Sequence, residues 1–193
     1  MRIVILGAPG SGKGTQAKLL SEDLNIPHIS TGELLRAAVS AGTELGIQVK
    51  EVMSSGQLVS DDIMLGLIEE RLGRDDARDG FLLDGYPRNL VQAEALDELL
   101  SRMGIPVEEA IDIAVDNEQI IERISKRAEL EDRSDDTEEV VRRRLQIYAE
   151  QTAPVSAHYS KHGVLTQVLG VGSIDAVYSR ISAALKQADA PAS

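Results

Sequence analysis

The residues from Gly7 to Thr15, GAPGSGKGT, nearly match a loop that binds the phosphate groups of a nucleotide. In the pattern G-x-x-x-x-G-K-S/T, backbone N–H groups surround the phosphates, the lysine reaches the transferred phosphate and the final hydroxyl binds Mg²⁺. Gly12 and Lys13 match, but Gly14 stands where the hydroxyl is required, and the threonine comes one residue late. The stretch therefore indicates either a damaged nucleotide site or one that holds its metal ion in another way.

The segments on either side of this loop favour a working phosphate site. Residues 3–6 form an apolar run typical of a buried strand, and residues 13–24 have the character of a helix. A helix N-terminus attracts anions through its free N–H groups and its dipole. This strand–loop–helix order is the setting that the phosphate-binding pattern requires.

Asp84 is the candidate acidic partner of the loop. It ends the apolar run FLLD at 81–84, so we expect it at the end of a strand that neighbours the loop. A Mg²⁺ ion that bridges phosphates needs an oxygen ligand, or a carboxylate that holds its water ligands. The alternative is that Asp84 and Gly85 form only a turn.

Apolar runs alternate with helical stretches along the chain, which predicts an α/β fold with a parallel sheet covered on both faces. The predicted strands cover residues 3–6, 28–29, 81–83, 110–115 and 164–168. Helix starts are marked by capping-box patterns at 30–33, 116–119 and 136–139, with Asp in place of Ser or Thr in the last two.

Two segments interrupt this alternation. Residues 30–59 supply two helical stretches without an apolar strand, which predicts a small helical insertion. Residues 127–137, RAELEDRSDDT, are charged and almost free of large apolar side chains, so they are either an exposed movable loop or an ordinary solvated connector.

The composition limits the class of protein. A chain of 193 residues fits one domain, and its net charge of −12 argues against a nucleic-acid-binding protein, which needs a broad basic face. It contains no cysteine, which excludes disulfides and thiolate zinc sites.

No apolar run is long enough to span a membrane and no leader sequence is recognisable, so we expect a cytoplasmic protein without membrane contacts. Arginine makes up 14 of the 20 basic residues, which suits small phosphate anions or reflects genome composition alone.

Five motifs together resemble the adenylate kinase family, in register from Met1 to about Leu185. They are GAPGSGKGTQ, ISTGELLR, QLVSD at 57–61, GFLLDGYPR at 80–88 followed by Gln92, and DDTEEVVRRRL at 135–145. In that family the phosphate loop reads G-x-P-G-x-G-K-G-T, so Gly14 is the usual residue and the site is not damaged.

The resemblance implies a P-loop NTPase-type three-layer α/β fold with a central five-stranded parallel sheet. It divides the single domain into a core (1–29, 60–126 and 138–193), a helical nucleoside monophosphate-binding insertion (30–59) and a short lid (127–137). It implies reversible phosphoryl transfer from Mg-ATP to AMP, which gives two ADP, in a protein that is usually a monomer. The partners are then small nucleotides, with no nucleic acid and no membrane.

The same resemblance assigns residues to the two nucleotides. ATP would lie on Gly10, Ser11, Gly12, Lys13, Gly14, Thr15, Arg123, Arg127 and the Gly172 backbone. AMP would lie against Thr31, Arg36, Gln57, Leu58, Val59, Gly85, Tyr86, Pro87, Arg88, Gln92, Arg133 and Arg144. The groups that act on the transferred phosphate would be Lys13, Asp84, Arg88, Arg127, Arg133 and Arg144.

Mg²⁺ is the one metal ion that the resemblance implies. Since residue 14 offers no hydroxyl, we expect the ion to be held by phosphates and by water molecules that Asp84 orients, with no direct side-chain ligand. Zinc is not expected, because the short lid lacks the larger domain that carries zinc ligands in long-lid relatives.

One assignment can be checked from helical periodicity alone. At about 100° per residue, Val141, Leu145 and Tyr148 form one apolar stripe. Arg144 flanks that stripe at roughly 60°, whereas Arg143 points nearly opposite. We therefore predict that Arg144 is partly buried and that Arg143 lies in solvent.

Two rival functions remain at this point. Pyrimidine monophosphate kinases share the phosphate loop and the DG-x-PR motif, but they typically carry Ala where this chain has Thr31, and a different stretch around Gln92. Hydroxyl and amide groups can read the edge of adenine, which favours AMP. A catalytically silent nucleotide-binding regulator should have lost some of the arginines, yet Arg88, Arg133 and Arg144 are all present.

The three histidines are not expected to be catalysts. His28 falls in a predicted strand, and His158 and His162 lie near a helix end, where a solvent-facing or capping role is the expectation.

Overall fold

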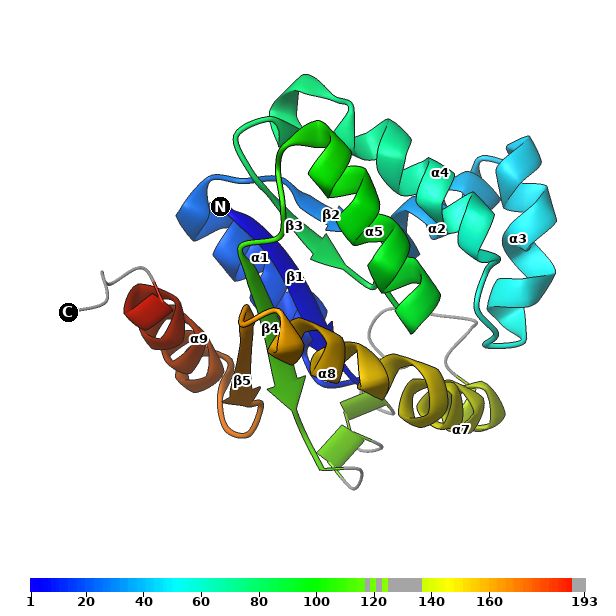
Figure 1. Cartoon of the computed structure of the whole chain (residues 1–193). Helices are drawn as coiled ribbons and strands as arrows, with labels where there is room; N and C mark the ends of the chain where they lie inside the picture. The colour runs from blue at the N-terminus through cyan, green and yellow to red at the C-terminus, as the bar shows by residue number, and fades with distance from the viewer. Residues whose placement is uncertain (117–118, 121–122, 125–136, 189–193) are drawn as a thin grey trace.

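The computed structural model describes residues 1–116, 119–120, 123–124 and 137–188. Its centre is a five-stranded, all-parallel sheet with the order β2-β3-β1-β4-β5 (Figure 1). The strands are β1 (Arg2–Gly7), β2 (His28–Ser30), β3 (Phe81–Asp84), β4 (Glu109–Ala114) and β5 (Leu165–Leu169). Each predicted strand is confirmed to within one or two residues, as is the predicted α/β fold.

Helices cover both faces of this sheet because its strands bury alternate side chains on opposite faces. On one face, Ile3 and Ile5 of β1 pack against α1 (Lys13–Leu24) and α9 (Ile174–Ala188). On the other face, Val4 and Leu6 pack against α4 (Asp61–Leu72), α5 (Leu90–Met103) and α8 (Ala153–Lys161). Both sets of β1 side chains are buried, which is why the strand reads as a continuous apolar run.

The strand register brings the candidate chemical groups to one edge of the sheet. Ile5 of β1 pairs with Asp84 of β3, and Ser30 of β2 pairs with the same Asp84. The carboxyl ends of these three strands therefore meet where β1 leads into the phosphate loop. Ligands of open α/β sheets bind at such an edge.

Ser30 is the last residue of β2, and the rest of the segment 30–59 forms two helices and no strand, as the sequence predicted. They are α2 (Thr31–Ser40) and α3 (Glu44–Ser54). The Ser30 hydroxyl accepts the N–H of Glu33 at 3.4 Å, which confirms the predicted helix start with Ser30 as its N-cap, and the Thr43 hydroxyl caps α3 through the N–H of Gly46 at 3.1 Å. The two helices pack against each other.

The helix α7 (Glu138–Ile147) continues through a π-helical turn at Tyr148–Thr152 into α8. Its N-cap is Thr137, whose hydroxyl accepts the N–H of Val140. The capping box predicted to begin at residue 136 was therefore wrong by one position, because the threonine hydroxyl fulfils the capping role. Arg144 is half-buried and Arg143 exposed, which confirms the prediction from periodicity.

Two expectations lie partly outside the described residues. The box at 116–119 includes residues 117 and 118; in the described part, the Asp116 carbonyl accepts the N–H of Ile120 at 3.1 Å. The predicted short lid, residues 127–137, is described only at Thr137.

A short turn at Asp75–Ala77 completes the described helical elements.

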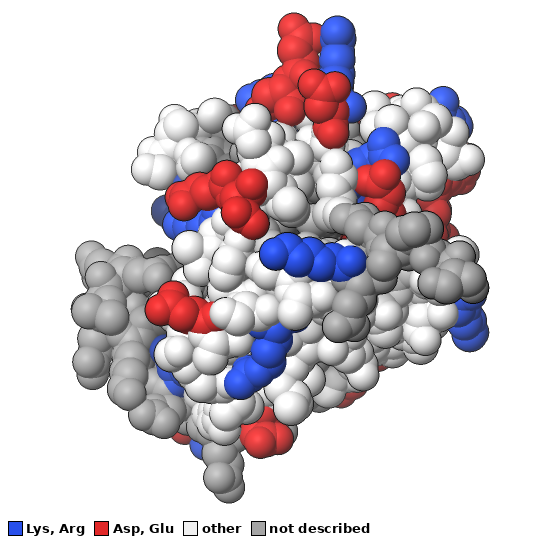
Figure 2. Space-filling model, turned by 90° about the vertical axis from the view of Figure 1, so that its left-hand side faces the viewer, with Lys and Arg blue, Asp and Glu red and all other residues white. Residues whose placement is uncertain are grey.

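The face seen in Figure 2 carries acidic and basic side chains interspersed among uncharged ones. On that face, the described residues form no continuous basic surface. None of the helices among the described residues is both long and apolar enough to cross a membrane. The expectation that this acidic chain does not bind nucleic acid stays a prediction.

Two glycines inside helices give a matched test of the packing of the insertion. A Cβ at Gly46 would lie 2.1 Å from the carbonyl oxygen of Ala38 in α2, whereas a Cβ at Gly66 in α4 would meet nothing within 4 Å. We expect Gly46→Ala to lower the free energy of unfolding by about 1–3 kcal/mol through overpacking. We expect Gly66→Ala to raise it by about 0.5–1 kcal/mol, because alanine is the better helix former.

Urea unfolding monitored by circular dichroism measures both changes. Equal effects of the two substitutions would show that α2 and α3 do not pack as tightly as the structure indicates.

Candidate active site

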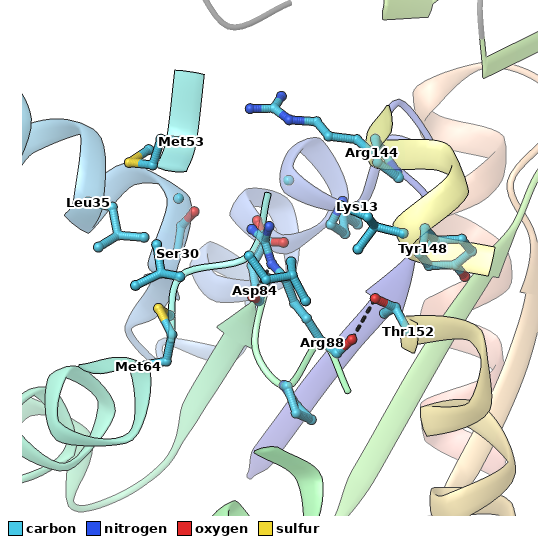
Figure 3. A pocket seen from close by; sticks show the side chains of 18 of the residues that line it. Lys13, Ser30, Leu35, Met53, Met64, Asp84, Arg88, Arg144, Tyr148 and Thr152 are labelled. Atoms are coloured by element: carbon cyan, nitrogen blue, oxygen red, sulfur yellow. Dashed lines mark hydrogen bonds between the residues drawn. The ribbon is translucent and has the colours of Figure 1, made fainter. Parts of the chain in front are cut away.

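A cavity of about 210 Å³ opens at the carboxyl edge of the sheet. Its wall is formed by the phosphate loop, α2, the end of α3, the loop after β3, and α7 with the turn that follows it (Figure 3). One side is apolar, with Leu35, Met53 and Met64, and the other is cationic, with Lys13, Arg88 and Arg144, as Figure 3 shows. Such a cavity suits a ligand with a flat apolar part and an anionic part.

The phosphate loop is held in one conformation by its glycines. Gly10 and Gly12 have φ of +81° and +91°, in the left-handed region that other residues rarely adopt. A Cβ at Gly10 would also lie 2.7 Å from Cγ1 of Ile124. The Lys13 ammonium donates to the Ala8 carbonyl at 3.4 Å, so its side chain folds back over the loop.

Asp84 is a buried carboxylate that the site keeps ionised. Its side chain accepts a hydrogen bond from Nε2 of His28 at 3.3 Å. Burial favours the neutral acid, but the hydrogen bond from His28 and the charges of Lys13 and Arg88 outweigh it, and the pKa of Asp84 lies below its ordinary value. An ionised carboxylate beside the phosphate loop can accept hydrogen bonds from the water ligands of Mg²⁺, so the residues present fit this ion.

Gly14, which stands where the phosphate-loop pattern has a hydroxyl, lies beside Asp84. A Cβ at Gly14 would lie 3.4 Å from Oδ2 of Asp84, which is an ordinary van der Waals distance. The carboxylate from β3 therefore lies next to the position where the pattern places its hydroxyl.

Three arginines from different elements converge on the cavity. Arg36 comes from α2, Arg88 from the loop after β3 and Arg144 from α7. Burial lowers the pKa of Arg88 below its ordinary value, and repulsion from Arg144 and Arg36 lowers it further. The negative charge of Asp84 opposes this change only in part. Since a guanidinium stays protonated in proteins, the positive charges in this part of the site repel one another. A bound anion would reduce this repulsion.

Backbone contacts hold Arg88 in place. Its Nε donates to the Gly85 carbonyl at 2.7 Å, and the Thr152 hydroxyl donates to the Arg88 carbonyl at 2.7 Å, the latter bond drawn in Figure 3. The second bond joins the loop after β3 to the end of the π-helical turn. Thr152 was not predicted, and its position outside every motif gave no signal.

The predicted base-reading groups, Thr31 and Gln92, are both buried. The Thr31 hydroxyl donates to the Gly85 carbonyl at 2.9 Å, which leaves its oxygen as an acceptor. Gln92 accepts the N–H of Arg88 at 2.7 Å through Oε1 and donates through Nε2 to Asp61 at 2.8 Å.

Sequence reasoning missed Asp61 as a site residue. Its Oδ1 accepts from both Nε2 of Gln92 and Nδ2 of Asn89, the latter at 2.9 Å, and thereby fixes the orientation of the Gln92 amide. Asp61 ends the QLVSD motif and begins α4, so its type alone reads as an ordinary acidic residue in the first turn of a helix.

A second set of contacts lies beside the phosphate loop and outside the cavity wall. Arg123 donates to the carbonyls of Ser11 at 3.1 Å and Gly170 at 2.7 Å, which ties the phosphate loop to the loop after β5. Gly172 in that loop has φ of +112°. Arg180 of α9 donates to the Leu169 and Val171 carbonyls and shapes the same loop; no motif pointed to it.

Most predicted site residues come together. Those that line the cavity are Lys13, Gly14, Arg36, Gln57, Leu58, Val59, Asp84, Gly85, Pro87, Arg88, Gln92 and Arg144. The Tyr86 side chain instead packs in the hydrophobic core, and Thr15 is exposed. Arg127 and Arg133 lie outside the described residues.

Comparison with known proteins identifies the family. A family model described as adenylate kinase matches residues 5–164, which is most of the chain. The chain belongs to the adenylate kinase family. A protein named adenylate kinase from Xanthomonas euvesicatoria pv. vesicatoria (strain 85-10) is 57% identical over 185 residues, which cover 96% of this chain and 99% of that protein. Another so named, from Stenotrophomonas maltophilia (strain K279a), is 55% identical over 186 residues, covering 96% of this chain and 100% of its own length.

Membership of the adenylate kinase family confirms the resemblance carried by the five motifs. It also gives the cavity its context, because the family's phosphate loop, the DG-x-PR loop and the arginine-rich helix are the segments that meet there. His28 lies in β2 as predicted, and it contacts the carboxylate of Asp84, a partner that the sequence did not indicate.

The ionisation of Asp84 can be measured directly. In the variant His28→Leu, burial is opposed only by the charges of Lys13 and Arg88, so we expect the pKa of Asp84 to rise. A ¹³C NMR titration of the aspartate carboxyl groups measures this change. Asp76 is an internal control, because its pKa is lowered by a hydrogen bond from Arg71 at the surface and should not move.

The same titration fixes the sign of the effect on stability. In the wild type, the lowered pKa means that ionised Asp84 stabilises the fold fully above its ordinary pKa of 3.8, and that this contribution is lost as the pH falls through the folded-state pKa. An unchanged Asp84 pKa in His28→Leu would contradict the role given to His28.

Proposed function

We propose that this chain catalyses the reversible transfer of a phosphoryl group from Mg-ATP to AMP, which gives two molecules of ADP. The observation that carries the proposal is the convergence of Arg36, Arg88 and Arg144 on one cavity, beside Lys13 and the ionised Asp84. Relatives that share more than half of its residues over nearly their full length are named adenylate kinase.

AMP fits the cavity with its phosphate toward the arginines. A phosphate bound there would relieve the repulsion that lowers the pKa of Arg88. The adenine would then lie on the apolar side, against Leu35, Met53 and Met64. Thr31 and Gln92 would read its edge, and the backbone of 57–59 and 85–88 would complete the pocket.

ATP would place its phosphates on the loop from Gly10 to Thr15. Backbone N–H groups and the N-terminus of α1 would bind the phosphate oxygens there, with Lys13 on the transferred group. Asp84 would orient water molecules around Mg²⁺, an ion that neutralises charge on the phosphates when bound. The adenine would lie between Arg123 and the loop that contains Gly172.

Catalysis of the transfer depends mainly on the alignment of the two nucleotides and on positive charge around the transferred phosphoryl group. The transition state is loose, with charge spread over the phosphoryl oxygens, so no general base is needed. Lys13, Arg88 and Arg144 would hold the two nucleotides in line, and we assign the same role to Arg127 and Arg133. We also propose that the insertion 30–59 and the lid 127–137 close over the substrates and exclude water, so that ATP is not hydrolysed.

We further propose a monomeric enzyme of the cytoplasm. A chain without cysteine is in keeping with a reducing compartment. The site described above lies within one chain, so the proposed reaction needs no second copy.

The test of this function is turnover with several acceptors in parallel. Purified protein is incubated with Mg-ATP and AMP, UMP, CMP or GMP, and the diphosphate products are separated by anion-exchange chromatography. We expect ADP from AMP at a rate far above that of any other acceptor. Exclusive use of a pyrimidine nucleotide would replace this proposal with a UMP/CMP kinase, and no turnover at all would favour a nucleotide-binding regulator.

Lys13→Met tests the role of the loop in the same assay. We expect it to lower kcat at least 100-fold, because it removes the positive charge of the Lys13 ammonium, which would stabilise the transferred phosphate. Its unfolding midpoint in urea should stay close to that of the wild type, since Lys13 lines the cavity and its side chain is not part of the hydrophobic core. Wild-type kcat in the variant would refute the role.

Asp61→Ala tests how the acceptor base is selected. Without the carboxylate, the amide of Gln92 loses the partner that fixes its orientation. We expect KM for AMP to rise about tenfold with a smaller change in kcat, and discrimination against GMP to weaken, since a misplaced polar group discriminates poorly. The matched control is Asp62→Ala, which removes an exposed carboxylate from the same helical turn and should leave KM unchanged.

A further inference from the structure

A cluster of metal-ligating side chains lies away from the nucleotide cavity, where α5 packs against α8 (Figure 1). It consists of Asp97 on α5, His158 on α8 and His162 at the end of α8. One potential ligand atom from each residue lies within 4.8 Å of the other two. We propose that these three residues bind a divalent transition metal ion, with zinc as the best fit.

The two histidines have the spacing of a helical metal site. Residues four apart lie on the same face of a helix, one turn above the other. The rings of His158 and His162 accordingly lie with their centroids 4.5 Å apart. Two imidazoles at this spacing form the metal-binding pair of several helical zinc sites, and here the third ligand comes from the neighbouring helix.

Existing hydrogen bonds place these ligands before a metal ion arrives. Nδ1 of His162 lies 2.8 Å from the His158 carbonyl, which can only accept, so Nδ1 carries the proton and Nε2 of a neutral ring holds a free lone pair. Nε2 of His158 lies 2.7 Å from Oδ2 of Asp97, and zinc would replace the proton that these two atoms share, which is released to solvent. The His158 ring also packs edge-on against buried Tyr159, at 5.2 Å between centroids.

His158 corrects an expectation from the sequence. Its side chain is only 13% exposed and it pairs with Asp97, whereas the sequence suggested a solvent-facing or capping role. His162 does cap the helix, because it donates to a carbonyl of the last turn, and it is exposed. The exposed ring leaves the site open to an ion from solvent, with water as a fourth ligand.

The donor set selects the class of metal. Two imidazole nitrogens and one carboxylate oxygen suit zinc, whereas Mg²⁺ prefers oxygen ligands alone. In tetrahedral zinc sites the bonds are about 2.0–2.1 Å, so ligand atoms lie roughly 3.3 Å apart. The 2.7 Å contact between His158 and Asp97 would open slightly and His162 would move closer, which side-chain rotations allow.

Zinc at this position would fasten α5 to α8. Both helices begin beside the nucleotide cavity, since α5 follows the Arg88 loop and α8 follows Thr152. None of the site's three residues belongs to the lid segment 127–137, for which zinc was not expected, and none of them lines the cavity proposed for the nucleotides and Mg²⁺. The rival explanation is that Asp97 and His158 form a simple polar pair between the helices, in which case His162 has no role in metal binding.

The test is isothermal titration calorimetry, in which zinc chloride is added to the nucleotide-free, full-length protein. We expect one zinc ion per chain, and at least tenfold weaker binding in His162→Ala and in Asp97→Asn. Glu98→Gln is the matched control, because this neighbouring carboxylate is exposed and pairs with Arg102. It should bind zinc as the wild type does, and none of the three variants should change turnover of Mg-ATP and AMP in zinc-free buffer.

Two further measurements separate the proposal from its rival. Cobalt chloride should give the visible absorption of a tetrahedral Co²⁺ site in the wild type and lose it in His162→Ala, and a large excess of MgCl₂ should not displace zinc. At a hundredfold excess over its dissociation constant, zinc should raise Tm by about 5 °C or more. Wild-type zinc affinity in His162→Ala, equal loss in Glu98→Gln, displacement by Mg²⁺ or no binding to the wild type would each overturn the site.

Discussion

The site depends on keeping one carboxylate ionised at the buried edge of a parallel sheet. Asp84 is only 7% exposed, and burial alone would favour its neutral form. Three features counter this: the hydrogen bond from His28, and the charges of Lys13 and Arg88. Each of them comes from a different segment, and the strand register brings all three to the same edge, because β1 and β2 both pair with β3 at Asp84.

The unusual phosphate loop lies beside the same carboxylate. A Cβ at Gly14 would be 3.4 Å from Oδ2 of Asp84, an ordinary van der Waals distance. Asp84 is thus an acidic group next to the position that lacks a hydroxyl, and orienting the water ligands of Mg²⁺ is the role we propose for it. Burial, and after it repulsion from Arg144 and Arg36, lowers the pKa of Arg88, and this repulsion between cations favours an anion in the cavity.

The sequence predicted the sheet and the residues of its chemical edge because both leave local signals. Buried parallel strands read as apolar runs, and the phosphate loop has a fixed spacing of glycines and lysine. The half-buried position of Arg144 followed from helical periodicity, as its observed burial confirms. What the sequence could not give was contacts between distant segments: the His28–Asp84 bond spans 56 positions, and the Asp61–Gln92 bond spans 31. An aspartate in the first turn of a helix reads the same whether or not it fixes a glutamine amide.

The contact between Asp61 and Gln92 belongs to a set of hydrogen bonds that connects the groups proposed to read the base with the arginine proposed to bind the phosphate. These bonds meet at the loop after β3. Gln92 accepts the Arg88 N–H through one end of its amide and donates to Asp61 through the other, so the residue assigned to the base is bonded to the backbone of an arginine assigned to the phosphate. The Thr31 hydroxyl donates to Gly85, whose carbonyl also accepts from Nε of Arg88. A displacement of the loop after β3 would therefore move the base-reading groups and the cation together. In the proposed function, recognition of both ends of one small anion would then depend on the position of the loop after β3, which the end of that strand anchors in the sheet.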